Sequence, residues 1–283
     1  MNKAQSAHSY HLCIYYTETR EKIKHPPAFP SIFWDERVMK MSRYIFYPIN
    51  RSQVLQAAGE ALKSRGYGVV DRPCESVTHL LLPVPSFDPG GTVKGGIPLD
   101  DILSQLHRDV TVIGGNLDHP ALEGYKTIDL LQDPFYLARN AAITAHCALG
   151  LILTGLPVTL PEQEVLIIGY GRIGKCMADL LRNIGARVTV AARKETDRAM
   201  AESLGHRSIT PNEWTPDQYR IIVNTVPAPV LDAAQCNSNA LLLDLASSRG
   251  IIGERVNWAR GLPGICTPET SGHLIAETVL RLI

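Results

Sequence analysis

Short apolar runs alternate with stretches of helical periodicity along most of the sequence. Residues 165–168 read Val-Leu-Ile-Ile, an uninterrupted apolar run that is typical of a parallel strand buried on both faces. The residues after this run place apolar side chains on one stripe, which predicts an amphipathic helix that Gly185 is positioned to end. A second apolar run at 187–191 completes a predicted strand–helix–strand unit.

Residues 41–132 repeat this alternation in a smaller unit. The pattern predicts helices at 52–64 and 99–107 and strands at 44–47, 67–70, 78–83, 111–113 and 126–129. This arrangement is typical of an α/β domain with a mainly parallel sheet, whose ligands collect beyond the carboxyl ends of the strands. The loops 84–91 and 114–116 are therefore expected near a substrate, whereas His79 is expected to be structural.

One long helix is predicted to connect two domains at residues 133–157. Asp133 and Pro134 are the acid and the proline typical of a helix start, and Gly155 and Pro157 end the pattern. The second domain is then expected at 158–268, and a final helix at 269–283 is expected to pack back on the first domain. Residues 1–40 are polar and contain three prolines at 26, 27 and 30, which predicts a disordered extension.

A polar stripe runs along the connecting helix. Asn140, Thr144 and Cys147 recur at spacings of four and three residues and therefore share a face, whereas Arg139 and His146 lie on other faces. We interpret the stripe as a wall of the cleft between the domains, with ordinary polar packing between helices as the alternative. Asn140, Thr144 and His146 are the candidate catalytic residues, and His146 is a candidate acid or base near neutral pH.

Three glycines follow the buried strand in the spacing G-x-G-x-x-G. Gly169 allows a tight turn, Gly171 lets a pyrophosphate approach the backbone, and Gly174 lets helix and strand pack closely. The start of the helix supplies the positive end of a dipole. This context on both sides predicts a dinucleotide site, contacted here by Gly169, Tyr170, Gly171, Arg172, Ile173 and Gly174.

The residues after the second strand indicate which dinucleotide is bound. An NAD site places an acid there to bind the ribose 2′-hydroxyl, whereas this chain has Ala192, Arg193 and Lys194 and no acid before Glu195. Arg193 is suited to bind a 2′-phosphate through two charge-assisted hydrogen bonds. The sequence therefore predicts NADP rather than NAD, a solvated surface arginine being the alternative.

Further strands are predicted at 203–208, 221–225 and 241–245, with a helix near Pro211 capped by Thr210. The strand ends are expected at the nicotinamide side of the cleft, where they add the cofactor contacts Thr225, Val226, Pro227, Leu245 and Ala246. Asp244 interrupts an apolar run and is expected to bind backbone amides. The segment 261–268 is predicted to be a stiff loop. The whole pattern predicts a two-domain α/β protein: a C-terminal Rossmann-type doubly wound parallel sheet and a smaller N-terminal flavodoxin- or Rossmann-like domain.

Composition adds mainly exclusions. The 28 basic and 28 acidic residues balance, which gives no electrostatic case for nucleic acid or an anionic membrane. The six cysteines form no CxxC pair and are expected to be reduced and mostly buried, as in a cytoplasmic protein. Cys266 is expected to be buried, with a reactive thiol in a loop as the alternative. No signal peptide or metal site is predicted. The apolar segment 141–160 is interrupted by His146 and Pro157 and is interpreted as a buried helix.

As a set, these motifs resemble the dipicolinate synthase A-subunit family. The resemblance covers about 133–283 well. It rests on Tyr136-Leu-Ala-Arg-Asn140 with Thr144-Ala145, the fingerprint 165–174, Ala191-Ala-Arg193, Val223-Asn-Thr-Val-Pro227, Leu243-Asp-Leu-Ala-Ser247 and Gly261-Leu-Pro-Gly-Ile265 with Thr267-Pro268. His146 and Glu269 stand where the family commonly has Glu and Lys.

The resemblance implies a protein that works with a flavoprotein-like B subunit in spore-forming bacteria. Together they would oxidise dihydrodipicolinate, a small dicarboxylate formed in lysine biosynthesis, to pyridine-2,6-dicarboxylate, with NADP accepting the hydride. Two other hypotheses stay open. One is an NADP-dependent dehydrogenase of a 2-hydroxy or 2-amino acid, although the Arg-Glu-His set of hydroxy-acid dehydrogenases is missing. The other is a non-catalytic NADP-binding scaffold. A homo-oligomer is also left open.

Overall fold

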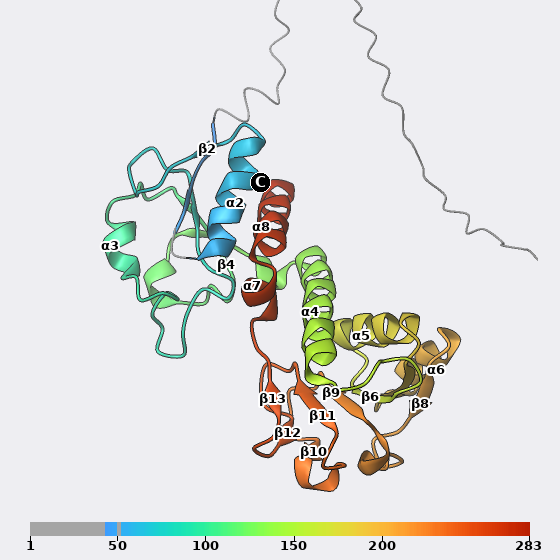
Figure 1. The fold of residues 1–283 in the computed structure, drawn as a ribbon. Coiled ribbons are helices and arrows are strands. Elements are labelled where there is room, and N and C mark those ends of the chain that lie inside the picture. Colours follow the sequence, from blue (N-terminus) through green and yellow to red (C-terminus); the bar gives the residue numbers. More distant parts are fainter. Residues whose placement is uncertain (1–42, 50–51) are drawn as a thin grey trace, which may run out of the picture. The chain divides into compact units, whose positions relative to one another are not determined.

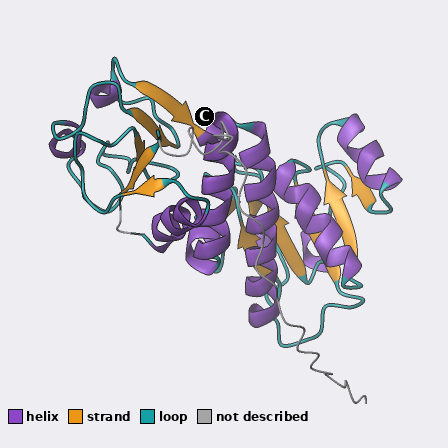
Figure 2. Cartoon of the chain, turned by 90° about the horizontal axis from the view of Figure 1, so that it is seen from above, coloured by secondary structure: helices purple, strands orange, loops and turns teal. Residues whose placement is uncertain are grey.

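Two parallel β-sheets organise the chain in the computed structural model (Figure 1). The structure describes residues 43–49 and 52–283, so the extension expected at 1–40 lies outside the described residues. All of the described residues belong to one compact unit that spans Glu36–Ile283. Figure 2 shows the strands in two separate groups with long helices between them.

The first sheet has the strand order β2-β1-β3-β4-β5, and every neighbouring pair is parallel. This is the flavodoxin-like order, in which successive strands are added on opposite sides of β1, so that the topological switch point lies between β1 and β3. The strands are short and agree with the predicted runs within one or two residues. They are β1 (Ile45–Pro48), β2 (Gly68–Val69), β3 (His79–Leu81), β4 (Thr111–Gly114) and β5 (Lys126–Asp129).

The second sheet has the order β13-β11-β9-β6-β7-β8 and is also parallel throughout. Numbered within the domain, this is the Rossmann order 3-2-1-4-5-6, which reverses between β6 and β9. A separate two-stranded sheet pairs β10 with β12. The strands are β6 (Glu164–Ile168), β7 (Arg187–Ala191), β8 (Arg207–Ile209), β9 (Ile221–Asn224), β10 (Leu231–Asp232), β11 (Leu241–Asp244), β12 (Ile251–Ile252) and β13 (Asn257–Trp258).

The α-helices are α2 (Gln53–Ser64), α3 (Leu99–Leu103), α4 (Pro134–Gly155), α5 (Arg172–Asn183), α6 (Glu195–Ser203), α7 (Leu262–Cys266) and α8 (Pro268–Leu282). Four 3-10 helices complete the described elements: η1 (Pro120–Leu122), η2 (Leu130–Gln132), η3 (Pro216–Gln218) and η4 (Ala233–Gln235). Ser52 and Asp133 cap α2 and α4 by accepting hydrogen bonds from backbone amides three residues on, at 3.2 and 2.8 Å.

Three local predictions were wrong. The segment after Thr210 forms turns and η3 instead of an α-helix, because Pro216 would stand inside that helix and has no amide hydrogen to donate. The predicted loop at 261–268 contains α7, which begins after Gly261 in the left-handed conformation and has Pro263 in its first turn. Cys266 at its end is exposed, not buried, and the five described cysteines are free.

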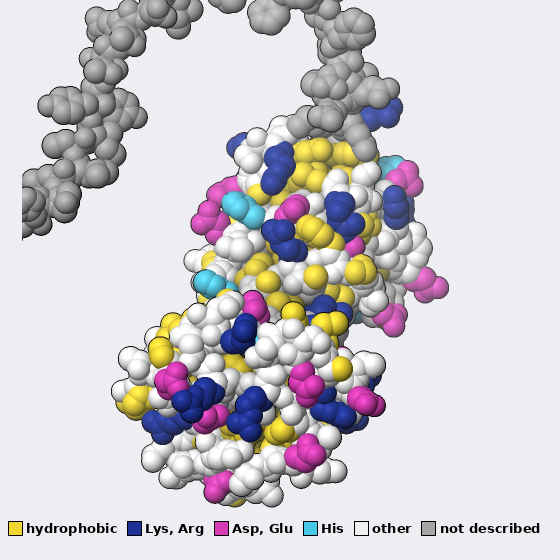
Figure 3. Space-filling model, turned by 90° about the vertical axis from the view of Figure 1, so that its right-hand side faces the viewer, with side chains coloured by type: hydrophobic (Ala, Val, Ile, Leu, Met, Phe, Trp, Pro, Cys, Tyr) yellow, Lys and Arg dark blue, Asp and Glu magenta, His cyan; other side chains and the backbone are white. Residues whose placement is uncertain are grey.

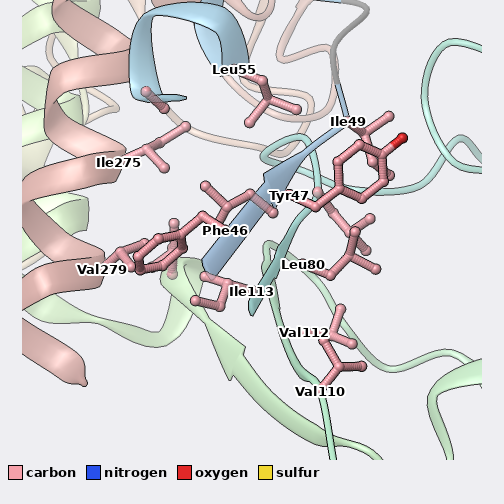
Figure 4. Close-up of a cluster of buried hydrophobic side chains, with 14 of the residues drawn as sticks. Phe46, Tyr47, Ile49, Leu55, Leu80, Val110, Val112, Ile113, Ile275 and Val279 are labelled. Atoms are coloured by element: carbon pink, nitrogen blue, oxygen red, sulfur yellow. The ribbon is translucent and has the colours of Figure 1, made fainter. Parts of the chain in front are cut away.

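Each sheet has its own core. Helices α4, α5 and α6 cover one face of the second sheet, and irregular segments with η4 cover the other. The core of the first sheet includes side chains of the last helix in the chain. Figure 4 shows Ile275 and Val279 of α8 beside Phe46 and Leu55 of the first domain, and all four are at most 2% exposed. The C-terminal helix therefore completes the N-terminal domain.

Helices α2 and α8 pack closely because a glycine lies at their contact. A Cβ atom added at Gly272 would lie 2.7 Å from the Ala58 backbone nitrogen and 2.6 Å from the Ala57 Cβ. Helix α8 also contacts α4, where the Arg281 guanidinium pairs with the Asp133 carboxylate that caps α4. The two helices thus tie the first domain to the connecting helix.

Helix α4 is long and apolar enough to cross a membrane by length and composition alone, with a mean hydropathy of 1.3 over its most apolar window. In the structure it packs against α5, α7 and α8. These contacts favour a core helix, as predicted. The molecular face in Figure 3 intersperses Lys and Arg with Asp and Glu, in line with the balanced composition.

The two helical glycines at 150 and 272 form a matched pair for testing the α2–α8 contact. Gly272→Ala should lower the free energy of unfolding by about 1–3 kcal/mol through overpacking. Gly150→Ala, where an added Cβ meets nothing within 4 Å, should raise it by about 0.5–1 kcal/mol through helix propensity. Midpoints of denaturant unfolding check both signs, and equal shifts would contradict the close contact.

His79 predicts the acid sensitivity of the first domain. Its Nδ1 atom shares a hydrogen bond of 2.8 Å with the Thr78 hydroxyl, and its ring packs on the rings of Tyr44 and Phe46. Burial, with a smaller contribution from the Lys126 charge, lowers the His79 pKa from 6.5 to about 4. Between pH 6.5 and pH 4, His79 binds a proton in the unfolded chain but not in the folded one. The contribution of neutral His79 to the free energy of unfolding is therefore fully present above pH 6.5 and is lost as the pH falls to 4. The slope due to His79 is at most about 1.4 kcal/mol per pH unit.

The variant His79→Phe keeps the ring packing and removes the titrating group. Unfolding free energies measured from pH 7 to pH 4 should therefore fall less steeply for the variant than for the wild type. Identical slopes would mean that His79 is not kept neutral in the folded protein.

Candidate active site

A cavity of about 720 Å³ lies where the carboxyl ends of both sheets meet. The first sheet contributes Ile49 after β1 and the segment 83–85 after β3, the two strands at which its order reverses. The second sheet contributes Thr225 after β9 and Leu245 after β11. Ligands of open α/β sheets bind at such reversal points, and the volume is in the range of small-molecule sites. Both topologies therefore direct a ligand to one place.

The glycine fingerprint has the geometry of a phosphate-binding turn. Gly169 adopts φ +93°, and an added Cβ would lie 2.7 Å from the Thr225 hydroxyl oxygen. An added Cβ on Gly174 would collide with the carbonyl oxygen of Gly169, whereas one on Gly171 would meet nothing within 4 Å. Gly171 is the N-cap of α5 and no side chain caps the helix there, so the first amides remain available to an anion. These residues fit a pyrophosphate.

Two predicted cofactor contacts are available only through the backbone. The Tyr170 side chain is 4% exposed and lies edge-on to His206 in the domain core, and the Ala192 side chain is also 4% exposed. The neighbouring side chains of Arg172, Arg193 and Lys194 are exposed. The cationic side chains at the end of β7 therefore face solvent beside the glycine turn.

Arg198 of α6 holds the turn that carries Arg193. Its Nη1 atom donates to the carbonyl oxygens of Ala192 and Arg193, both at 2.9 Å. The first acid after β7 is Glu195, in the first turn of α6. This end of the strand thus combines a fixed backbone with two exposed cations, an arrangement that fits a 2′-phosphate.

A buried polar network fixes the loops after β9 and β11. Asn224 and Asp244 are both fully buried, and the Asn224 amide donates to Asp244 Oδ1 at 2.9 Å. Asp244 also accepts from the amides of Ala246, Gly250 and Ile251 at 2.7 to 3.0 Å, which confirms the expectation from sequence. Such charge-assisted bonds are strong in a buried setting. They hold the loops that bring Thr225 and Leu245 to the cavity wall.

Five of the predicted cofactor contacts lie on the cavity wall, namely Ile173, Thr225, Pro227, Leu245 and Ala246. Val226 is in the same loop, where its amide donates to the Asn224 side chain at 3.0 Å. The remaining predicted contacts belong to the glycine turn and the end of β7 described above. The structure thus brings the predicted cofactor residues together along the carboxyl edge of β6, β7, β9 and β11.

The predicted catalytic residues of α4 separate into two groups. Asn140 and Thr144 line the cavity, and the Thr144 hydroxyl donates to the Asn140 carbonyl oxygen at 2.8 Å. His146 lies on the exposed side of α4 and is not among the cavity-lining residues. Its position gives no support to a role as acid or base, because helical geometry turns it away from Asn140 and Thr144.

Sequence reasoning missed the ionisable residues of the cavity. Lys94 follows β3 in the loop after Pro85, Arg260 lies between β13 and α7, and Tyr136 is one turn before Asn140. Burial raises the Tyr136 pKa to about 12, so this phenol remains protonated at neutral pH. Lys94 and Arg260 lie in segments without periodicity, where no sequence signal separates a site residue from a surface cation.

The cavity wall contains no carboxylate and no histidine among the described residues. Within the described ranges, no group of three or more His, Cys, Asp or Glu side chains is placed to hold a metal ion. The arrangement therefore presents cations, amides and hydroxyls to a ligand.

Comparison with known proteins agrees with this geometry. Residues 154–261 match the family described as D-isomer specific 2-hydroxyacid dehydrogenase, NAD binding domain. The dipicolinate synthase A subunit of Bacillus subtilis (strain 168) is 26% identical over 235 residues, which are 75% of this chain and 79% of that protein. This match confirms the resemblance that the motifs predicted.

Solved structures share the fold. The crystal structure of the dipicolinate synthase A subunit from Bacillus halodurans superposes with a TM-score of 0.73 at 20% identity, covering 86% of this chain and 98% of that one. An L-alanine dehydrogenase superposes with a TM-score of 0.59 at 12% identity, covering 87% and 82%. The chain is therefore similar to the dipicolinate synthase A subunit over most of its length, and its residues 154–261 form a nicotinamide-nucleotide-binding domain of the dehydrogenase kind.

Proposed function

We propose that this chain is an NADP-dependent oxidoreductase that oxidises dihydrodipicolinate to pyridine-2,6-dicarboxylate, together with a flavoprotein-like B subunit. One observation carries the proposal: the reversal points of two parallel sheets open on one cavity, beside a complete glycine turn. The similarity to the dipicolinate synthase A subunit supports the choice of substrate and of partner.

The bound nicotinamide would accept a hydride from the substrate ring. The nicotinamide ring would be placed against the cavity by Thr225, Pro227, Leu245 and Ala246, because the Asn224–Asp244 network holds their loops. Asn140 and Thr144 would orient the substrate from α4. The Tyr136 phenol, protonated at neutral pH, would donate a hydrogen bond and would not remove a proton.

The balance of the reaction suits this cavity. The dihydropyridine ring would lose a hydride to NADP and a proton to solvent water and would become aromatic, so the thermodynamics favour oxidation. The match to the 2-hydroxyacid dehydrogenase domain favours a second candidate, oxidation of a 2-hydroxy acid. Both reactions release a proton, and the described cavity wall carries no carboxylate or histidine to take it. The two candidates differ in that only the first forms an aromatic ring.

Arg193 tests the choice of NADP. Arg193→Ala should weaken NADP binding by about 1.5–3 kcal/mol, the value of a lost charged hydrogen bond, and should leave NAD binding nearly unchanged. Arg207→Ala is a matched control because Arg207 is exposed at the start of β8, and its register partner Thr189 is two residues before the end of β7. Calorimetric titration of each variant with NADP and with NAD gives the two affinities to be compared. Equal losses for NADP and NAD in the Arg193 variant would contradict a 2′-phosphate contact.

Turnover tests the substrate. The purified protein and its B partner, given the lysine-pathway dihydro compound and NADP, should form pyridine-2,6-dicarboxylate and an equal amount of NADPH, followed by absorbance. Parallel reactions with 2-hydroxy and 2-amino acids should form no NADPH. Turnover of those acids alone would support the dehydrogenase alternative, and tight NADPH binding without any turnover would support a scaffold.

A further inference from the structure

The charges on the cavity wall have one sign. The described lining residues include Lys94 and Arg260, and no aspartate or glutamate accompanies them. The chain as a whole has as many acidic as basic residues, so this separation is local. A partly enclosed site with two cations and no lining carboxylate favours an anionic ligand.

The two cations come from different domains. Lys94 belongs to the loop between β3 and α3, and its amide donates to the Ser86 carbonyl oxygen of the same loop at 2.9 Å. Arg260 follows β13, the last strand of the second sheet. A ligand in the cavity is thus offered one cation from each side.

The Arg260 guanidinium is oriented by an aromatic ring. It lies 5.2 Å from the centroid of Trp258, whose indole nitrogen donates to the Ala246 carbonyl oxygen at 3.0 Å. Arg249 also lies over the Trp258 ring, at 5.0 Å, but is not among the residues that line the cavity. Two arginines therefore stack on Trp258, and of these two only Arg260 lines the cavity.

The cations also influence each other. Burial lowers the pKa of Lys94, the Asp88 carboxylate opposes that shift, and the Arg260 charge adds to it. Two like charges in one cavity are unfavourable unless a counter-charge compensates for them. A ligand with two carboxylates would neutralise both at once.

We infer that Lys94 and Arg260 are the two specificity-determining residues of the cleft, each binding one carboxylate of a small dicarboxylic acid. The inference rests on the proposed function in one respect, that the cavity is the substrate site. It names one substrate-binding residue from each domain. Arginine is suited to paired hydrogen bonds with one carboxylate, and lysine would act on the other as a point charge.

Binding of pyridine-2,6-dicarboxylate and of pyridine-2-carboxylate, measured by calorimetry in the presence of NADPH, tests the inference. The wild type should prefer the dicarboxylate. Lys94→Gln and Arg260→Gln should each lower its affinity for the dicarboxylate by about 10- to 100-fold, as expected for a lost charged hydrogen bond. Each variant should then bind the two acids almost equally, because one of the two cations on the described cavity wall remains for one carboxylate.

Arg249→Gln is the matched control, since it removes the other arginine that stacks on Trp258. It should keep the wild-type preference for the dicarboxylate, and Arg260→Lys should keep most of it because the charge stays. NADPH affinity should be unchanged in all four variants, which verifies that the nucleotide domain is folded. A wild-type preference retained in Arg260→Gln or Lys94→Gln, or lost equally in Arg249→Gln, would overturn the assignment. A wild type that binds no NADPH would instead overturn the proposed function.

Discussion

The close contact of α8 with α2 decides how this protein forms a cleft. Gly272 lets the backbones of the two helices approach, and the apolar side chains of α8 then complete the core of the first sheet. Because α7 and α8 follow directly from the last strand of the second sheet, this contact returns the chain to the first domain. The chain therefore passes between the two domains twice, once through α4 and once between β13 and α7, and the cavity lies beside these connections.

Two devices within the second sheet prepare the nucleotide side of that cleft. At Gly169 and Gly174 the missing side chains allow a turn and a helix to pack where any Cβ would collide. At Asn224 and Asp244 the opposite strategy is used, since fully buried polar side chains saturate the amides of the neighbouring loops. Both features fix backbone positions, so a ligand would meet a surface that is already organised.

The rest of the cavity is organised differently, by charge and by apolar contact. Its wall is mostly aliphatic and proline-rich, with Asn140 and Thr144 on one side and the cations Lys94 and Arg260 on the others. In such surroundings electrostatic attraction is less screened than in water, and the sign of the ligand matters more than its detailed shape. A ring that carries carboxylates and loses a hydride is compatible with both the apolar wall and the positive charge.

Local sequence signals determined much of this architecture, because they depend on residues close in the chain. The apolar run 165–168, the glycine spacing, the caps at Ser52 and Asp133 and the isolated acid at Asp244 each have a local physical cause. Where Pro216 interrupted a predicted helix, as after Thr210, the local start signal was misleading. The charges of the cavity were decided by tertiary structure. Lys94 and Arg260 are brought to one wall by strand order and by the return of α8, and long-range packing of this kind leaves no periodic trace in the sequence.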